Sequence, residues 1–197
     1  METVNKENKK KSFNFSLIDN TSTSIPAGNI TFILSFCIPA LIFLALYYLR
    51  DIFPFGNDCY LRSDMYHQYA PFYSELWHKL RTGDTLLYSW DIGMGVNFTS
   101  LFAYYLASPI NWLIALLPQK YIEIMNMLIV MKLCASSVTF SYYISKHFHT
   151  KKCTIALFGM FYALSAYSAA YSWNIMWLDC IVLIPLIMLG LEKLVDE

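Results

Sequence analysis

Long apolar stretches without charged residues constrain this chain more than any other feature. The clearest is ITFILSFCIPALIFLALYYL, residues 30–49. As an α-helix it would be about 30 Å long, which matches the hydrocarbon core of a bilayer. It is longer than the apolar region of a signal peptide, which has about 7–15 residues. Charged residues make up only 14% of the chain, against about 25% in soluble domains. The sequence therefore predicts an all-α integral membrane protein.

Further apolar stretches occupy residues 121–145, 155–173 and 175–194. Together with residues 30–49 they predict about four transmembrane helices, because each is close to the length that a membrane crossing needs. Residues 1–29 are polar and rich in lysine, serine and asparagine, which is typical of a disordered tail.

The positions of the lysines predict the topology, because Lys and Arg in short loops stay on the cytoplasmic side. The lysine-rich tail and residues 146–154, KHFHTKKCT, are both predicted to be cytoplasmic. An even number of crossings must then separate them. Because residues 30–49 and 121–145 supply two, the apolar but proline-broken stretch 101–118 is predicted to be re-entrant or interfacial. Residues 50–120 then form one large extracytoplasmic loop of a multi-pass membrane protein.

Within this loop the sequence predicts an amphipathic helix on the outer membrane surface. Pro71 suits its first turn and Gly83 suits its end. Glu75 and Lys79 are spaced to pair on one face. Another face carries apolar residues at every fourth position: Phe72, Leu76 and Leu80.

A polar cluster stands directly before this helix, in RSDMYHQY, residues 62–69. Asp64 has two interpretations, which the pattern leaves open. It could cap the start of the helix, or it could act as a general base on an acceptor hydroxyl at the membrane–water boundary. In the second case its neighbours become candidate substrate-binding residues: Arg62, His67, Gln68 and Tyr69.

Two charged residues fall inside or beside the predicted spans. Lys132 lies near the middle of its span, so it must pair, reach the interface or line a wet cavity. It could pair with Asp179 or Asp64, or it could hold a lipid phosphate. Asp179 lies near the start of the last span, close to Asn174, and both are candidate substrate-binding residues.

The stretch YSWDIGMGVNFTS predicts a tight turn at its glycines, with Asp91 and Asn97 as possible substrate contacts. The five cysteines and four histidines have no metal-site spacing, so no metal-ligand set is predicted. Carboxylates such as Asp64 and Asp179 could still hold a divalent cation, Mg or Mn. A net charge of zero gives no reason to expect a nucleic-acid partner.

The stretches RSDMYHQYAPFYSELWHKLRTGDTLLYSWDIGMGVNFTSLFAYYLASPINWLIALLP and WNIMWLDCIVLIPLIMLGLEKL resemble the bacterial YfhO-type membrane proteins. The resemblance covers about residues 30–194. It implies a GT-C type glycosyltransferase, which moves a sugar from a polyprenyl-phosphate donor to an extracytoplasmic cell-wall polymer such as lipoteichoic acid. It also maps the catalytic acid of the first outer loop onto Asp64. Lys132 and Asp179 fall where similar sequences carry these residue types.

Under this hypothesis Asp64 takes the proton of the acceptor hydroxyl, which attacks the anomeric carbon with inversion. Arg62, Lys132 or a metal ion would stabilise the leaving polyprenyl phosphate. Members of the family are several times longer, so this chain is expected to be an N-terminal part or a truncated product. A non-catalytic or accessory membrane protein, and a translocator of lipid or sugar, are the alternatives.

Overall fold

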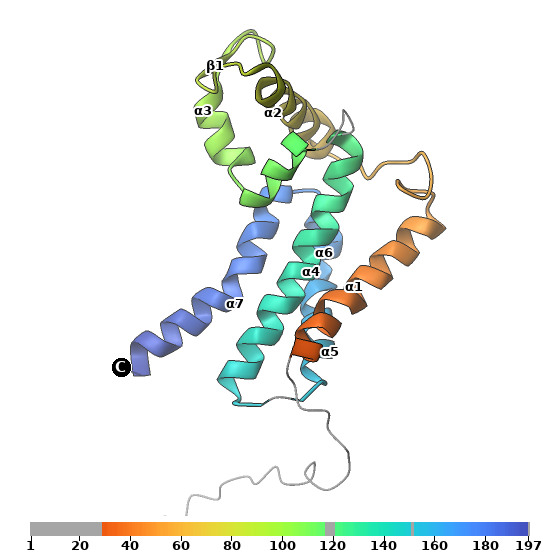
Figure 1. The fold of residues 1–197 in the computed structure, drawn as a ribbon, viewed down its shortest axis with the longest axis vertical. Coiled ribbons are helices and arrows are strands. Elements are labelled where there is room, and N and C mark those ends of the chain that lie inside the picture. The colour runs from red at the N-terminus through yellow and green to blue at the C-terminus, as the bar shows by residue number, and fades with distance from the viewer. Residues whose placement is uncertain (1–28, 117–120, 151, 197) are drawn as a thin grey trace, which may run out of the picture.

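The computed structural model describes residues 29–116, 121–150 and 152–196. The predicted N-terminal tail and part of the predicted 146–154 loop lie outside these ranges. Figure 1 shows a helix bundle and, over one end of it, a cap formed by residues 50–116. Among the described residues the only strands are β1 (Tyr88–Ser89) and β2 (Val96–Asn97), which pair antiparallel in the cap. The predicted all-α membrane class is confirmed.

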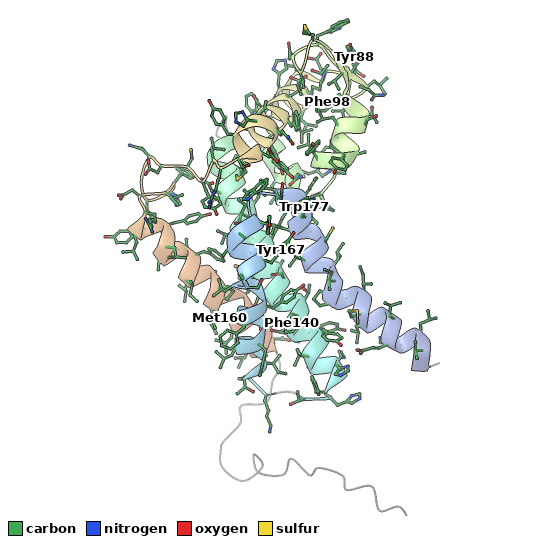
Figure 2. The ribbon with its side chains drawn as sticks, turned by 180° about the vertical axis from the view of Figure 1, so that it is seen from behind. Tyr88, Phe98, Phe140, Met160, Tyr167 and Trp177 are labelled. Carbon is green, nitrogen blue, oxygen red and sulfur yellow. The ribbon has the colours of Figure 1, made fainter. Side chains whose placement is uncertain are left out.

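The bundle is built around α4 (Tyr121–His147), which packs against α1 (Asn29–Leu49), α5 (Ile155–Ala163) and α7 (Ile175–Asp196). In α4, 61% of the apolar segment is buried, against 22% in α1 and in α7. Figure 2 shows side chains projecting outward along both of these outer helices. The helices α1, α4 and α7 are each long and apolar enough to cross a membrane. Because α1 and α7 turn most of their apolar surface outward, they have the surface that helices in lipid require.

The stretch predicted as one span at 155–173 is broken into α5 and α6 (Ala166–Tyr171). The break lies at Ser165, whose backbone is extended and whose hydroxyl accepts a hydrogen bond from the backbone N–H of Ser168. Serine favours this position because its side chain satisfies a free N–H at a helix start. The membrane crossing of this segment therefore stays a prediction.

Small and hydroxylated residues bring α1, α4 and α5 together. A Cβ atom added at Gly159 would lie 2.5 Å from the carbonyl oxygen of Ser137 and would also meet the hydroxyl of Ser141. Ser35 of α1 donates its hydroxyl hydrogen to Ser141 over 2.8 Å. The packing role expected of small residues in membrane helices is thus visible at Gly159.

In the cap, α2 (Ala70–Thr82) has the predicted limits, with proline in its first turn. It ends at Gly83, whose φ of 75° is the left-handed conformation that glycine adopts at helix ends. The predicted pair of Glu75 and Lys79 forms, at 3.3 Å, but both side chains are buried. Ser89 of the strand pair donates to Glu75 over 2.5 Å and Lys79 donates to the Tyr88 carbonyl over 2.9 Å. Glu75 and Lys79 therefore hold the strand pair instead of facing water.

The stretch 101–118 is divided among short helical segments in the part that the structure describes. These are the end of α3 (Phe98–Leu101), the π-helical η3 (Phe102–Leu106) and the 3₁₀-helical η4 (Pro109–Leu116). Asn111 is buried, and its amide donates to the Leu106 carbonyl over 3.1 Å. The segment thus folds as part of the cap, and its predicted re-entrant contact with the membrane stays a prediction.

Candidate functional site

The polar cluster before α2 lies on η2 (Met65–Tyr69), a π-helical turn that runs directly into α2. Turns of this kind are rare and are frequent at functional sites. Asp64 precedes η2 with a helical backbone, φ −65° and ψ −18°, and its half-buried side chain makes no capping hydrogen bond. The structure therefore does not support the capping interpretation of Asp64, and its role as a general base stays a prediction.

Tyr105 of η3 joins this cluster from the other side. Its hydroxyl donates to the side-chain oxygen of Gln68 over 3.0 Å, and its ring meets that of Tyr69 edge-on with centroids 5.6 Å apart. Burial, followed by the nearby Tyr104 and Asp64, raises the pKa of Tyr105. Its hydroxyl therefore remains a proton donor at neutral pH. Sequence reasoning missed Tyr105, although two adjacent tyrosines in an apolar stretch were a visible signal.

Lys132 and Asp179 form an ion pair between α4 and α7, with 2.9 Å between Nζ and Oδ2. Lys132 also donates to the Ile175 carbonyl over 3.1 Å, and Ser108 of the cap donates to the other oxygen of Asp179 over 3.0 Å. The Lys132 side chain is 0% exposed and that of Asp179 is 29% exposed. The pairing interpretation of Lys132 is therefore favoured, and it is Asp179 that is accessible.

Two buried tyrosines of the cap, Tyr69 and Tyr73, are affected by these carboxylates. Asp64 contributes to raising the pKa of Tyr69, and Asp179 to raising the pKa of Tyr73, in each case after the larger effect of burial. Tyr73 lies beside Asn111 and Tyr69 beside the backbone of Met176, although neither hydroxyl has a hydrogen bond of good geometry among the described residues. Tyr69 is fully buried in the apolar core, so its predicted contact with a substrate stays a prediction that its burial does not favour.

A cleft of about 450 Å³ runs between α7 and residues 103–110 of the cap. Its size lies in the range of small-molecule sites, roughly 300–1,000 Å³. Tyr105, which belongs to the Asp64 cluster, lines this cleft together with Ser108 and Asp179. We call it the Asp179 cleft. Residues far apart in the sequence, Tyr105 and Ser108 of the cap and Asp179 of α7, thus meet at one opening, which Asp64 itself does not line.

The other predicted site residues lie elsewhere. Arg62 and His67 are exposed, and the His67 ring meets that of its neighbour Tyr66 edge-on. Asp91 and Asn97 are exposed around the strand pair, and Asn97 caps α3 by accepting from the backbone N–H of Ser100 over 3.1 Å. Asn174 is buried between α6 and α7. Within the described ranges these five residues lie outside the lining of the Asp179 cleft.

The described residues contain no group of three or more His, Cys, Asp or Glu side chains that could together hold a metal ion. Asp64 and Asp179 therefore do not belong to a three-ligand cluster of this kind. The role of Asp179 is assigned from its hydrogen bonds and its place in the cleft lining, and that of Asp64 from its half-buried carboxylate, which makes no capping bond.

Comparison with known proteins identifies one family. The family described as "Bacterial membrane protein YfhO" matches residues 35–197. No curated protein and no solved structure matches the chain. The match includes α4, α5, α6, α7 and the whole cap, and therefore every residue of the candidate site. The chain belongs to the YfhO family of bacterial membrane proteins.

Proposed function

We propose that this chain carries the acceptor-activating part of a membrane glycosyltransferase. The enzyme would move a sugar from a polyprenyl-phosphate donor to a cell-wall polymer such as lipoteichoic acid, on the extracytoplasmic side of the bacterial membrane. One observation carries the proposal. Asp64 is a half-buried carboxylate that makes no capping bond, and it lies beside a tyrosine that lines a cleft at the junction of the cap and the bundle.

In this proposal Asp64 is the general base. It accepts the proton of an acceptor hydroxyl, whose oxygen then attacks the anomeric carbon of the donor sugar. The bond between that carbon and the phosphate oxygen breaks, with inversion, and the electron pair leaves with the polyprenyl phosphate. General-base catalysis of this kind contributes about 10²–10⁴-fold.

The remaining residues are assigned by their exposure. Arg62 is exposed two residues before Asp64, so it is the cation that we assign to the leaving phosphate. Asp179 presents a partly exposed carboxylate in the cleft, where it would accept hydrogen bonds from sugar hydroxyls. Lys132 is fully buried against Asp179, so it acts as a positioning residue for that carboxylate. Gln68 holds Tyr105 in place.

The test is sugar transfer in membranes that contain the wild-type protein or the variant Asp64→Asn. Radiolabelled donor lipid is added, and label in the extracted polymer is counted. We expect a loss of about 10²–10⁴-fold. Asp84→Asn is the matched control, because this acid of the same cap is exposed, lies 3.7 Å from His78 and follows the opposite end of α2 from Asp64.

Normal transfer by Asp64→Asn would reject the proposal. Movement of labelled donor across the membrane without new glycosidic bonds would identify a translocator instead. Equal loss in Asp84→Asn would show that any change of charge in the cap disturbs folding, and that the effect at Asp64 is not catalytic.

A further inference from the structure

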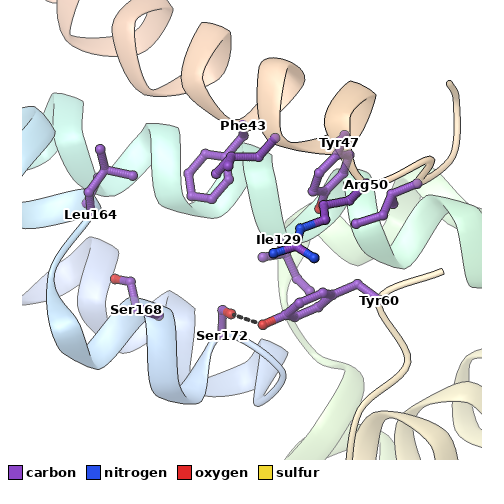
Figure 3. Close-up of a pocket in the computed structure, with 12 residues that line it drawn as sticks. Phe43, Tyr47, Arg50, Tyr60, Ile129, Leu164, Ser168 and Ser172 are labelled. Carbon is purple, nitrogen blue, oxygen red and sulfur yellow. Dashed lines mark hydrogen bonds between the residues drawn. The ribbon is translucent and has the colours of Figure 1, made fainter. Parts of the chain in front are cut away.

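A second hollow lies away from the Asp179 cleft, between α1, α4 and the α5–α6 break (Figure 3). Its volume is about 320 Å³. We call it the Arg50 groove. Its lining is mostly apolar and comes from the bundle: Phe43, Leu46, Ile129, Ala163, Leu164 and Ala169. The break at Ser165 helps to make this space, because α5 and α6 do not form one straight helix along α1.

One end of the groove is polar. Arg50 follows the last turn of α1, and Figure 3 shows its side chain pointing into the groove toward Tyr60. The hydroxyls of Tyr60 and Ser172 lie 3.4 Å apart at the same end. In the described parts of the chain no carboxylate lies within ion-pair distance of Arg50.

Hydrogen bonds within the protein hold this polar end in place. Asn126 of α4 accepts the backbone N–H of Tyr60 with its side-chain oxygen, and its carbonyl accepts the hydroxyl hydrogen of Tyr47, each over 3.1 Å. Asn126 is fully buried. It therefore ties the end of α1 and the segment before Asp64 to the same turn of α4, so Tyr60 is held at the groove.

The surroundings favour a lipid as the occupant. α1 turns most of its apolar surface outward, so the groove opens beside a helix that contacts lipid chains. An arginine at the end of such a helix can reach the membrane boundary with its charged head, at the level of the lipid phosphates. A planar guanidinium matches phosphate oxygens through paired, charge-assisted hydrogen bonds. A soluble phosphate would leave the apolar lining of the groove without a partner.

We propose that the Arg50 groove binds an anionic glycerophospholipid from the leaflet on the cap side. One hydrocarbon chain lies along the apolar lining between α1 and α6. The phosphate accepts hydrogen bonds from Arg50 and from the hydroxyls of Tyr60 and Ser172. This site is separate from the Asp179 cleft and does not depend on the proposed sugar transfer.

The test is lipid retention by the whole purified chain, measured by native mass spectrometry after delipidation. Phosphatidylglycerol and phosphatidylcholine are added at equal concentration. We expect the wild type to retain phosphatidylglycerol preferentially. Arg50→Gln should lower that retention by about 10- to 100-fold, because it removes charge-assisted hydrogen bonds to the phosphate.

Two further variants isolate the groove. Arg81→Gln makes the same change of charge on α2, where Arg81 lies over the Trp77 ring, and should retain phosphatidylglycerol as the wild type does. Ala169→Trp keeps Arg50 but fills the groove with an indole ring. Because Ala169 is exposed, the variant should still fold, and its retention of phosphatidylglycerol should fall. Equal retention by Arg50→Gln and wild type would overturn the proposal. So would equal retention of both lipids, unchanged retention by Ala169→Trp, or equal losses in Arg50→Gln and Arg81→Gln. Because no sugar is present in this assay, its failure is distinct from failure of the proposed function.

Discussion

Replacing either partner of the Lys132–Asp179 pair should destabilise the fold, but by different amounts. Removing one member of a buried pair costs about 3–5 kcal/mol, because it leaves an uncompensated charge. In Lys132→Met the remaining charge is Asp179, which is 29% exposed and still accepts from Ser108. We expect about 3 kcal/mol, the lower end of the range.

In Asp179→Leu the remaining charge is Lys132, which is 0% exposed. Its other hydrogen bond goes to the neutral Ile175 carbonyl, which cannot balance an ammonium group. We expect about 5 kcal/mol, the upper end of the range. The double variant Lys132→Met/Asp179→Leu contains neither charge, and it should be more stable than Asp179→Leu alone, since replacing a whole buried pair by apolar groups is often neutral.

The assay is thermal unfolding in detergent, followed by tryptophan fluorescence. At about 2–4 °C per kcal/mol for a domain of 150–250 residues, Tm should fall by about 6–12 °C in Lys132→Met and by about 10–20 °C in Asp179→Leu. A double variant whose loss equals the sum of the two single losses would show that the two side chains do not interact. A larger loss in Lys132→Met than in Asp179→Leu would contradict the assigned exposures.

Two further predictions concern packing and the cap. Gly159→Ala should lower the free energy of unfolding by about 1–3 kcal/mol, because the added methyl group presses on Ser137. Gly190→Ala on α7 should be neutral or slightly stabilising, because a Cβ atom there has no neighbour from outside its own helix turn within 4 Å. Equal Tm values for the two variants would contradict this prediction. Ser89→Ala should cost about 1–3 kcal/mol because it removes a hydrogen bond to the buried Glu75 carboxylate. Limited proteolysis should then cut residues 84–97 faster than in the wild type. The control Thr85→Ala removes an exposed hydrogen bond to the Leu87 N–H and should leave the cleavage rate unchanged. Equal cleavage rates in the two variants would argue against a stabilising role of the Ser89–Glu75 bond.

Much of this protein follows from local patterns. The apolar stretches predict the three long helices, because a bilayer requires about 20 apolar residues per crossing. The limits of α2 were also predictable, because Pro71 and Gly83 act through their own backbone geometry. Asp64 was recognisable as a candidate by its place at a helix start beside other polar residues.

Contacts between distant segments were decided only by the tertiary structure. The sequence left Lys132 three possible partners, and the packing of α7 on α4 brings Asp179, 47 positions away, to 2.9 Å. Tyr105 and Ser108 reach the site because η3 and the residues directly after it pack on α7. Arg50 faces a groove that exists only where α5 and α6 separate. Helix propensity, caps and apolar length depend on neighbours along the chain. Which carboxylate meets a buried lysine, and where a cleft stays open, depend on how whole helices pack.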